Sequence, residues 1–146
     1  KNLLKYKYVC FTDGDIVFLK ENIFSYLLDN IEDNDILCQS DIPSHAACSG
    51  FMFIRSNKKT KHYFNPDTIV EIDRDVLEKN KRWEDQEYVN RIINNLKYKL
   101  LPQDLFPNGD YYYNNSDKLD PMMIHFNWVI GNKKIERMKK YNKWYI

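Results

Sequence analysis

The chain has 146 residues, of which 43% are hydrophobic and 29% charged, and its formal net charge is +1. This composition is typical of a globular protein rather than a disordered one, and the length suits a single domain over residues 1–146. The charge lacks the basic excess that marks nucleic-acid-binding domains, and no apolar run is long enough to span a bilayer. We therefore expect neither a nucleic acid partner nor a membrane segment in this chain.

The three cysteines, Cys10, Cys38 and Cys48, form neither a CxxC pair nor a disulfide framework. Cys10 and Cys38 lie in apolar, strand-like runs, so we expect both side chains to fill the core. The unpaired, widely spaced set mildly favours a reducing compartment.

The first half of the chain predicts three strands and two helices. The strands are expected at residues 7–11, 35–39 and 49–55, where apolar residues run together between turn signals. Asn22 can cap a helix to Asn30, with an apolar face made of Ile23, Phe24, Leu27, Leu28 and Ile31. A turn is expected at residues 40–43 and a second helix at residues 56–64, ending before Pro66.

The second half continues the alternation of helices and strands. Residues 84–96 have the best helical pattern, with an apolar stripe made of Tyr88, Val89, Ile92, Ile93 and Leu96. Further strands are expected at residues 99–101 and 122–126, a turn at 107–110 and a basic helix at 133–141, while residues 68–79 show only weak helical spacing. Strands that alternate with helices indicate an α/β fold.

Two carboxylates, Asp13 and Asp15, follow the first predicted strand and flank Gly14. Hard divalent cations take oxygen ligands, and Mg²⁺ or Mn²⁺ usually keeps positions open for substrate phosphates. Open α/β sheets bind ligands beyond the carboxyl ends of their strands. The pattern therefore predicts a metal site for a phosphorylated substrate, although an Asp-Gly turn without function is a common alternative. The later carboxylates of an EF-hand loop are lacking.

Two motifs near the end of the chain extend this prediction. His125 directly follows an apolar strand, and an imidazole joined to two carboxylates favours manganese over calcium. Gly131 and Lys134 combine a glycine that allows close backbone approach with a lysine charge, which suits a diphosphate. The alternatives are a structural histidine and a solvated helix start.

Taken together and in this order, these pieces resemble the GT-A glycosyltransferases, specifically the nucleotide-diphospho-sugar transferase family related to plant cell-wall xylosyl- and arabinosyltransferases. The matching segments are residues 12–18, 49–56, 85–86, 101–102, 106–109 and 125–131, with Lys134. The resemblance implies a GT-A-like (Rossmann-like) mixed sheet flanked by helices. Because almost nothing precedes Asp13, where such enzymes have a nucleotide-binding βαβ half, we expect this chain to be the C-terminal portion of that domain.

The resemblance implies a metal and phosphate site. Asp13 and Asp15 would bind Mn²⁺ or Mg²⁺, with His125 as the third protein ligand. The metal and Lys134 would neutralise the leaving nucleoside diphosphate, and Gly131 would let the backbone approach the phosphates.

The resemblance also implies a sugar-binding side. Asp85 and Gln86 would lie near the transferred sugar or the acceptor hydroxyl, and Gly50 and Asn127 belong to the implied substrate-binding set. Cys48 stands where the family motif often has Asn or Thr, which is a departure from the pattern on this side.

The implied function is metal-dependent transfer of a sugar from a nucleotide-diphospho-sugar donor to a hydroxyl of a glycan or protein acceptor, mostly with retention of configuration. One alternative is a haloacid-dehalogenase-type phosphatase, with Asp13 as nucleophile and Asp15 as acid/base, although its later Gly-Asp-x₃₋₄-Asp element is lacking. The other is a non-catalytic glycosyltransferase remnant that binds a carbohydrate or a partner chain. The localisation, cytoplasmic or in the secretory-pathway lumen, is not indicated.

Overall fold

The protein is described by a computed structural model that covers residues 5–41, 46–79 and 84–145. Its strands are β1 (Tyr8–Thr12), β2 (Ile16–Phe18), β3 (Ile36–Asp41), β4 (Ala46–Arg55), β5 (Tyr98–Leu100) and β6 (Met123–His125). Its α-helices are α1 (Ile23–Asn30), α2 (Lys58–Tyr63), α3 (Pro66–Ile72), α4 (Arg74–Glu78), α5 (Asp85–Ile92), α6 (Gly109–Asn115) and α7 (Asn132–Lys140).

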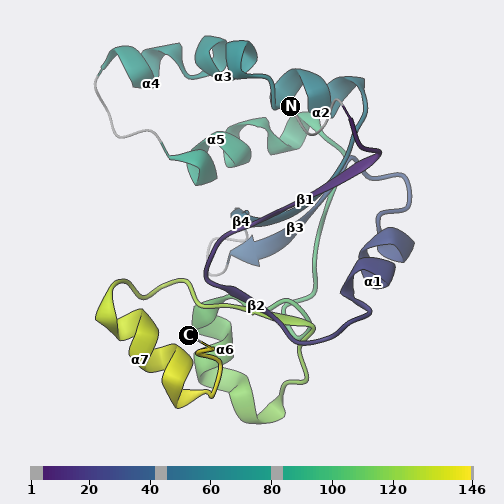
Figure 1. The fold of residues 1–146 in the computed structure, drawn as a ribbon. Helices are drawn as coiled ribbons and strands as arrows, with labels where there is room; N and C mark the ends of the chain where they lie inside the picture. Colours follow the sequence, from purple (N-terminus) through teal and green to yellow (C-terminus); the bar gives the residue numbers. More distant parts are fainter. Residues whose placement is uncertain (1–4, 42–45, 80–83, 146) are drawn as a thin grey trace.

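The centre of the molecule is a four-stranded mixed sheet in the order β1-β4-β3-β5 (Figure 1). β4 is antiparallel to both β1 and β3, and β5 is parallel to β3. β2 and β6 form a separate antiparallel pair, which lies below the main sheet in Figure 1 together with α6 and α7. The chain is therefore a mixed α/β structure, as the sequence predicts.

Both faces of the central sheet are covered, and this explains the continuous apolar run of β4. Phe51 and Phe53 pack into a core shared with α1, whereas Met52 and Ile54 pack into a core shared with α5. Successive side chains of a strand point to opposite faces, so a strand that is buried on both sides has no polar alternation. The five residues of the stripe predicted for the 84–96 helix are all buried in the second core.

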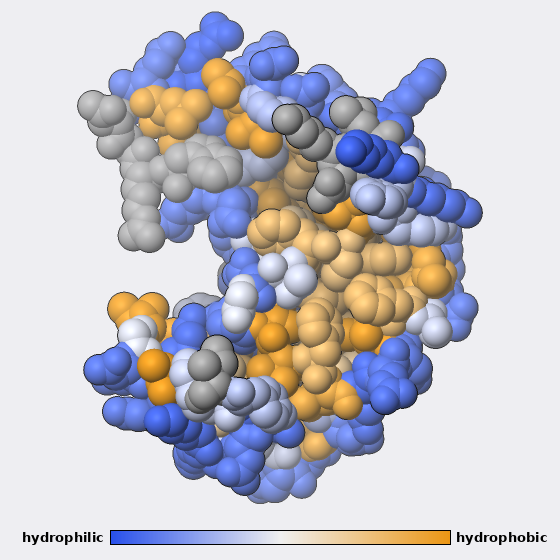
Figure 2. Space-filling view, viewed as in Figure 1, coloured by the Kyte–Doolittle hydropathy of each residue, from blue (hydrophilic) through white to orange (hydrophobic). Residues whose placement is uncertain are grey.

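The helix predicted at residues 22–30 is present as α1, but its apolar face is narrower than predicted. Ile23 and Leu27 are buried, and so is Ile31 just after the helix, whereas Phe24 and Leu28 are about half exposed. Figure 2 shows apolar side chains gathered at the surface over the region of β1, β2 and α1.

Two predicted turns are wrong. Of residues 107–110, Gly109 and Asp110 begin α6, because the Asn108 side chain accepts a hydrogen bond from the Tyr111 amide and caps the helix. Ser40 and Asp41 continue β3, since they pair with the beginning of β4. The other half of that predicted turn, residues 42–43, lies outside the described residues.

The ambiguous segment at residues 68–79 is helical. Asn65 caps α3 through the amide of Asp67, and Pro66 occupies the first turn, where its missing N–H costs nothing. Asp73 ends α3 and begins α4, and its buried carboxylate forms a two-point ion pair with Arg91 of α5.

The cysteines are all free thiols. Cys38 is buried in the core beside α5, and Cys10 packs against the core beside α1, so both fill the interior as predicted. In the part of the chain that the structure describes, no helix has both the length and the apolarity needed to cross a membrane.

Candidate functional site

Three strands bring the predicted metal ligands to one rim of the molecule. Asp13 directly follows β1, and its amide donates a hydrogen bond to the Gly50 carbonyl of β4. Asp15 precedes β2, and His125 is the last residue of β6, where it pairs with Ile16. The antiparallel β2–β6 pair therefore places the ring beside the two acids, although the ring follows them by most of the chain length.

The three side chains lie within reach of one cation. His125 Nε2 is 3.2 Å from Asp15 Oδ1 and 3.7 Å from Asp13 Oδ2. Each of the three residues offers one ligand atom, and these atoms all lie within 4.8 Å of one another. Two carboxylates and an imidazole are a donor set that Mn²⁺ accepts well, so the residues fit the metal that the family resemblance implies. Lys134 donates a hydrogen bond to Oδ2, the other oxygen of Asp15.

The two aspartates have opposite electrostatic environments. Burial by itself would raise the pKa of the Asp15 carboxyl, but hydrogen bonds from His125 and Lys134 outweigh it and lower the pKa well below its usual range. Partial burial raises the pKa of Asp13, the His125 charge opposes this, and the like charges of Asp15 and Asp85 add to the increase. One acid of the pair is thus strongly stabilised as a carboxylate, and the other is not.

The buried Gln39 side chain fixes the orientation of the His125 ring. Gln39 Nε2 donates to the Phe106 carbonyl at 3.1 Å, which leaves Oε1 to face His125 Nδ1 at 2.8 Å. Because a carbonyl oxygen only accepts, Nδ1 must carry a proton, and Nε2 is the ring nitrogen that faces the aspartates. The amide therefore selects the nitrogen available for a metal, in the manner of other outer-shell partners of metal-binding histidines.

Gly50 is at this site because nothing larger fits. A Cβ atom at this position would lie 2.4 Å from His125 Cε1 and 2.7 Å from Asp13 Oδ2. Gly14, between the two acids, has open space around it, so a side chain there would meet nothing within 4 Å. The resemblance implies a substrate-binding role for Gly50, which does line the cleft, and its lack of a side chain also lets the ring and the acid come together.

The three ligands open into a cleft of about 320 Å³. Figure 2 shows the molecule hollowed between the layer that contains α5 and the part that contains α7. The cleft is lined by residues from both sides, including Gln86 of α5 and Lys134 of α7. Gln86 Oε1 accepts hydrogen bonds from the amide and hydroxyl of Ser49, and its Nε2 donates to Asp41 at 3.0 Å.

Of the other predicted site residues, some line the cleft and others lie outside it. Asn127 lines the cleft, and its side chain accepts a hydrogen bond from the Gly109 amide at 2.7 Å. Asp85 is the first residue of α5 and does not line the cleft, but its negative charge helps to raise the pKa of Asp13. Gly131 has a positive φ of 56°, is exposed, and lies just outside the cleft lining, beside Ile130.

The sequence reasoning missed three residues that shape this cleft. Gln39 is a polar residue at the end of an apolar run, which was an available signal. Asp41 was read as part of a turn, yet it lines the cleft, and burial raises its pKa against the hydrogen bonds from Asn108 and Trp128. Trp128 lines the cleft with a positive φ of 64°, a strained conformation for a bulky residue. It lies in the matching segment 125–131, but the sequence assigned it no role.

A family model for nucleotide-diphospho-sugar transferases matches residues 2–138. The chain belongs to this family. The family is the one that the ordered motifs of the sequence resemble, and its match leaves the phosphatase alternative without support.

Two curated relatives are similar over nearly the whole chain. A UDP-galactose:fucoside alpha-3-galactosyltransferase of Dictyostelium discoideum is 29% identical over 94% of this chain and 25% of its own length. A UDP-D-xylose:L-fucose alpha-1,3-D-xylosyltransferase 3 of Arabidopsis thaliana is 27% identical over 99% of this chain and 45% of its own length. The chain therefore spans a quarter to just under half of these relatives.

Solved structures confirm the fold. The glycosyltransferase GlyE of Streptococcus pneumoniae TIGR4 superimposes with a TM-score of 0.65 over 97% of this chain and 40% of its own, at 15% identity. The WbbM bifunctional glycosyltransferase superimposes with a TM-score of 0.58 over 95% of this chain and 35% of its own, at 16% identity. The predicted GT-A-like mixed sheet flanked by helices is thus confirmed.

Proposed function

We propose that this chain carries the diphosphate-binding and sugar-transfer site of a glycosyltransferase that depends on Mn²⁺ or Mg²⁺. The observation that supports the proposal best is the meeting of Asp13, Asp15 and His125 within 4.8 Å at the rim of a cleft, with Lys134 on Asp15. The donor would be a nucleotide-diphospho-sugar, as the family requires. The acceptor would be a hydroxyl of a glycan or a protein-linked glycan.

The relatives narrow the substrates further. The names of both relatives specify a UDP-sugar donor, a fucose-containing acceptor and an alpha linkage. We infer the same classes for this chain, and we infer retention of configuration, because retention at a sugar that is alpha-linked to its diphosphate gives an alpha product. NMR of the anomeric proton in the initial product tests this inference, since a beta signal would contradict it.

At the leaving group, the metal ligands and the residues around them would have different roles: some neutralise charge and others position side chains. A bound divalent cation supplies Lewis-acid neutralisation of the charge that develops on the leaving diphosphate. Lys134 adds a fixed positive charge on the same side of the cleft. Gln39 keeps Nε2 of His125 facing the acids, and Gly50 leaves room for the ring.

The opposite wall of the cleft would orient the sugars. Gln86 joins Ser49 of β4 to Asp41 of β3 through three hydrogen bonds, so its amide is held rigidly. Asp41 also accepts a hydrogen bond from Asn108 at 3.4 Å, and it lines the cleft. Carboxylate and amide groups in such positions suit hydrogen bonding to sugar hydroxyls, and Asp85 adds negative charge near Asp13.

The test is donor turnover with a matched control. The chain is incubated with Mn²⁺ and a panel of nucleotide sugars, with and without fucosides, and released nucleoside diphosphate is measured. We expect Mn²⁺-dependent release that Asp15→Asn abolishes and Asp29→Asn, an exposed acid of α1, leaves unchanged. Release of inorganic phosphate from phosphomonoesters would instead support a phosphatase. Mn²⁺ binding without any release would support a non-catalytic remnant.

A further inference from the structure

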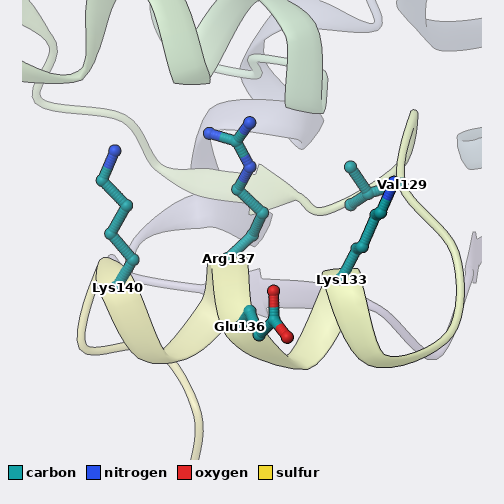
Figure 3. A pocket seen from close by; sticks show the side chains of 5 residues that line it. All are labelled: Val129, Lys133, Glu136, Arg137 and Lys140. Atoms are coloured by element: carbon teal, nitrogen blue, oxygen red, sulfur yellow. The ribbon is translucent and has the colours of Figure 1, made fainter.

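A second pocket lies beside the cleft, on the side of α7. It has a volume of about 500 Å³ and is lined by Val129 and by four charged residues of α7, namely Lys133, Glu136, Arg137 and Lys140 (Figure 3). Val129 also lines the cleft, so the two hollows share a wall. A ligand that extends out of the cleft past Val129 therefore reaches three cations and one acid.

The three cations share one face of the helix. Lys133, Arg137 and Lys140 are spaced at i, i+4 and i+7, and Figure 3 shows their side chains extending to the same side of α7. At 1.5 Å per residue, this row is about 10 Å long. A row of this length can contact a ligand with several anionic groups. It can also bind a ligand with one anionic group and leave space on either side of that group.

The row is not neutralised by the protein. Within the described residues, Lys133, Arg137 and Lys140 take part in none of the ion pairs shorter than 4.0 Å. The guanidinium of Arg137 lies 4.8 Å from the centre of the Tyr113 ring, which restricts its position by a cation–π contact. The pocket therefore presents three cations beside one acid, Glu136, and Arg137 has a restricted position.

We propose that this groove, defined by Lys133, Arg137 and Lys140, binds an oxyanion group, a carboxylate or phosphate, on the glycan acceptor. The inference rests on the proposed function. In that function the donor diphosphate is neutralised at Asp13, Asp15, His125 and Lys134, which leaves the groove for a different ligand. Guanidinium and ammonium groups bind oxyanions through charge-assisted hydrogen bonds, and Arg can do so at two points. The acceptor class is thus an acidic glycan.

The experiment compares a charged and an uncharged form of the same probe. Trigalacturonate and its methyl ester are titrated into the isotope-labelled protein, and binding is followed by the NMR signals of α7. We expect trigalacturonate to bind at least about tenfold more tightly than the ester, with the largest shifts at the groove. Equal binding of the two probes, or shifts confined to other elements, would overturn the proposal.

Matched variants assign the effect to the groove. Lys133→Gln with Lys140→Gln keeps the Arg137–Tyr113 contact, and we expect it to weaken trigalacturonate binding at least about tenfold. The control removes two exposed lysine charges that do not line the groove, Lys118→Gln with Lys139→Gln, and should change binding less than about twofold. Equal losses in both double variants would show a net-charge effect and contradict the proposal. Circular dichroism melting checks that each variant is folded.

A second measurement, of UDP binding, distinguishes an oxyanion of the acceptor from the phosphates of the donor. The affinity of UDP in the presence of Mn²⁺ should be unaffected by the Lys133→Gln and Lys140→Gln pair. A tenfold loss of UDP affinity with unchanged trigalacturonate binding would assign the groove to the donor and overturn the proposal. Failure of the proposed function has a different signature, because the parent protein would then lack Mn²⁺-dependent UDP binding while trigalacturonate still bound to the groove.

Discussion

The side chain of Gln39 determines which nitrogen of His125 faces the two aspartates. Its amide accepts from Nδ1 at 2.8 Å and is itself oriented by the Phe106 carbonyl. Loss of an outer-shell partner of a metal-binding histidine typically lowers metal affinity by about 10- to 100-fold. We expect Gln39→Leu to weaken Mn²⁺ binding by this factor, as measured by calorimetry.

Cys48→Ala is the control for this prediction. The Cys48 sulfur also approaches His125 Nδ1, but at 3.8 Å, and burial raises the thiol pKa to about 12, so it remains a neutral, weak partner. We expect this variant to keep Mn²⁺ affinity within about threefold of the parent. Equal effects of the two substitutions would show that packing around the ring, rather than the amide, sets its orientation.

The two aspartates should titrate in a defined order in the metal-free protein. The pKa of Asp13 lies above its ordinary value of 3.8 and that of Asp15 below it. Ionised Asp15 therefore stabilises the fold above pH 3.8, and this stabilisation is lost as the pH falls through its lowered folded-state pKa. Carboxyl-carbon NMR should show Asp13 protonating first on acidification, and the reverse order would contradict the account.

The negative charge of Asp85 contributes to the raised pKa of Asp13. Asp85→Asn should lower the pKa of Asp13, because one of the like charges that raise it is removed. Glu87→Gln, on the same helix, is the control, since Glu87 forms an ion pair with Arg91. An unchanged Asp13 titration in the Asp85 variant would place that carboxylate too far from the site to act there.

At the scale of single residues, the sequence indicated the ligands but not their partners. Asp13 and Asp15 could be predicted because two acids follow an apolar strand. His125 could be predicted because it ends another apolar strand. Asp41 and Trp128 could not be found in this way. Their place depends on how the start of β4 pairs with β3 and on a strained backbone at residue 128, and neither leaves a local pattern.

At the scale of elements, β4 has to contain a glycine where it passes Asp13 and His125. Gly50→Ala places a Cβ atom 2.4 Å from the His125 ring and 2.7 Å from Asp13, so both must move. We expect a loss of about 1–3 kcal/mol in the free energy of unfolding, measured by urea denaturation, and a loss of Mn²⁺ binding.

Gly14→Ala is the matched control, because a Cβ atom there meets nothing within 4 Å. Its effect on the free energy of unfolding should stay within about 0.5 kcal/mol. If Gly50→Ala were as mild as Gly14→Ala, the close packing of His125 against β4 would be wrong.

Helices were predictable where the apolar periodicity was strong. They were less predictable where a capping residue sets the start of the helix. The buried stripe of α5 followed directly from spacing. The turn predicted at residues 107–110 failed because Asn108 and Gly109, which are turn formers in isolation, here cap and begin α6. The prediction for α1 failed at Phe24 and Leu28, since helical spacing cannot distinguish a core-facing residue from one at an exposed apolar surface.

At the scale of the whole molecule, the site joins the central sheet to the separate β2–β6 pair. A cation bound by Asp13 after β1 and by His125 of β6 would tie these two parts together. Mn²⁺ at 100 times its dissociation constant should raise the free energy of unfolding by about 2.7 kcal/mol. Thermal melts should therefore shift upward with Mn²⁺ in the parent and not in Asp15→Asn, and an equal shift in both would exclude binding at this site.

The most direct measurement is an anomalous diffraction map of crystals grown with Mn²⁺ and a nucleoside diphosphate. We predict one strong peak about 2.0–2.3 Å from oxygens of Asp13 and Asp15 and from Nε2 of His125, with the diphosphate on its open side next to Lys134. A peak elsewhere, or one that the ring of His125 does not contact, would contradict the central claim that these three side chains bind a single catalytic cation.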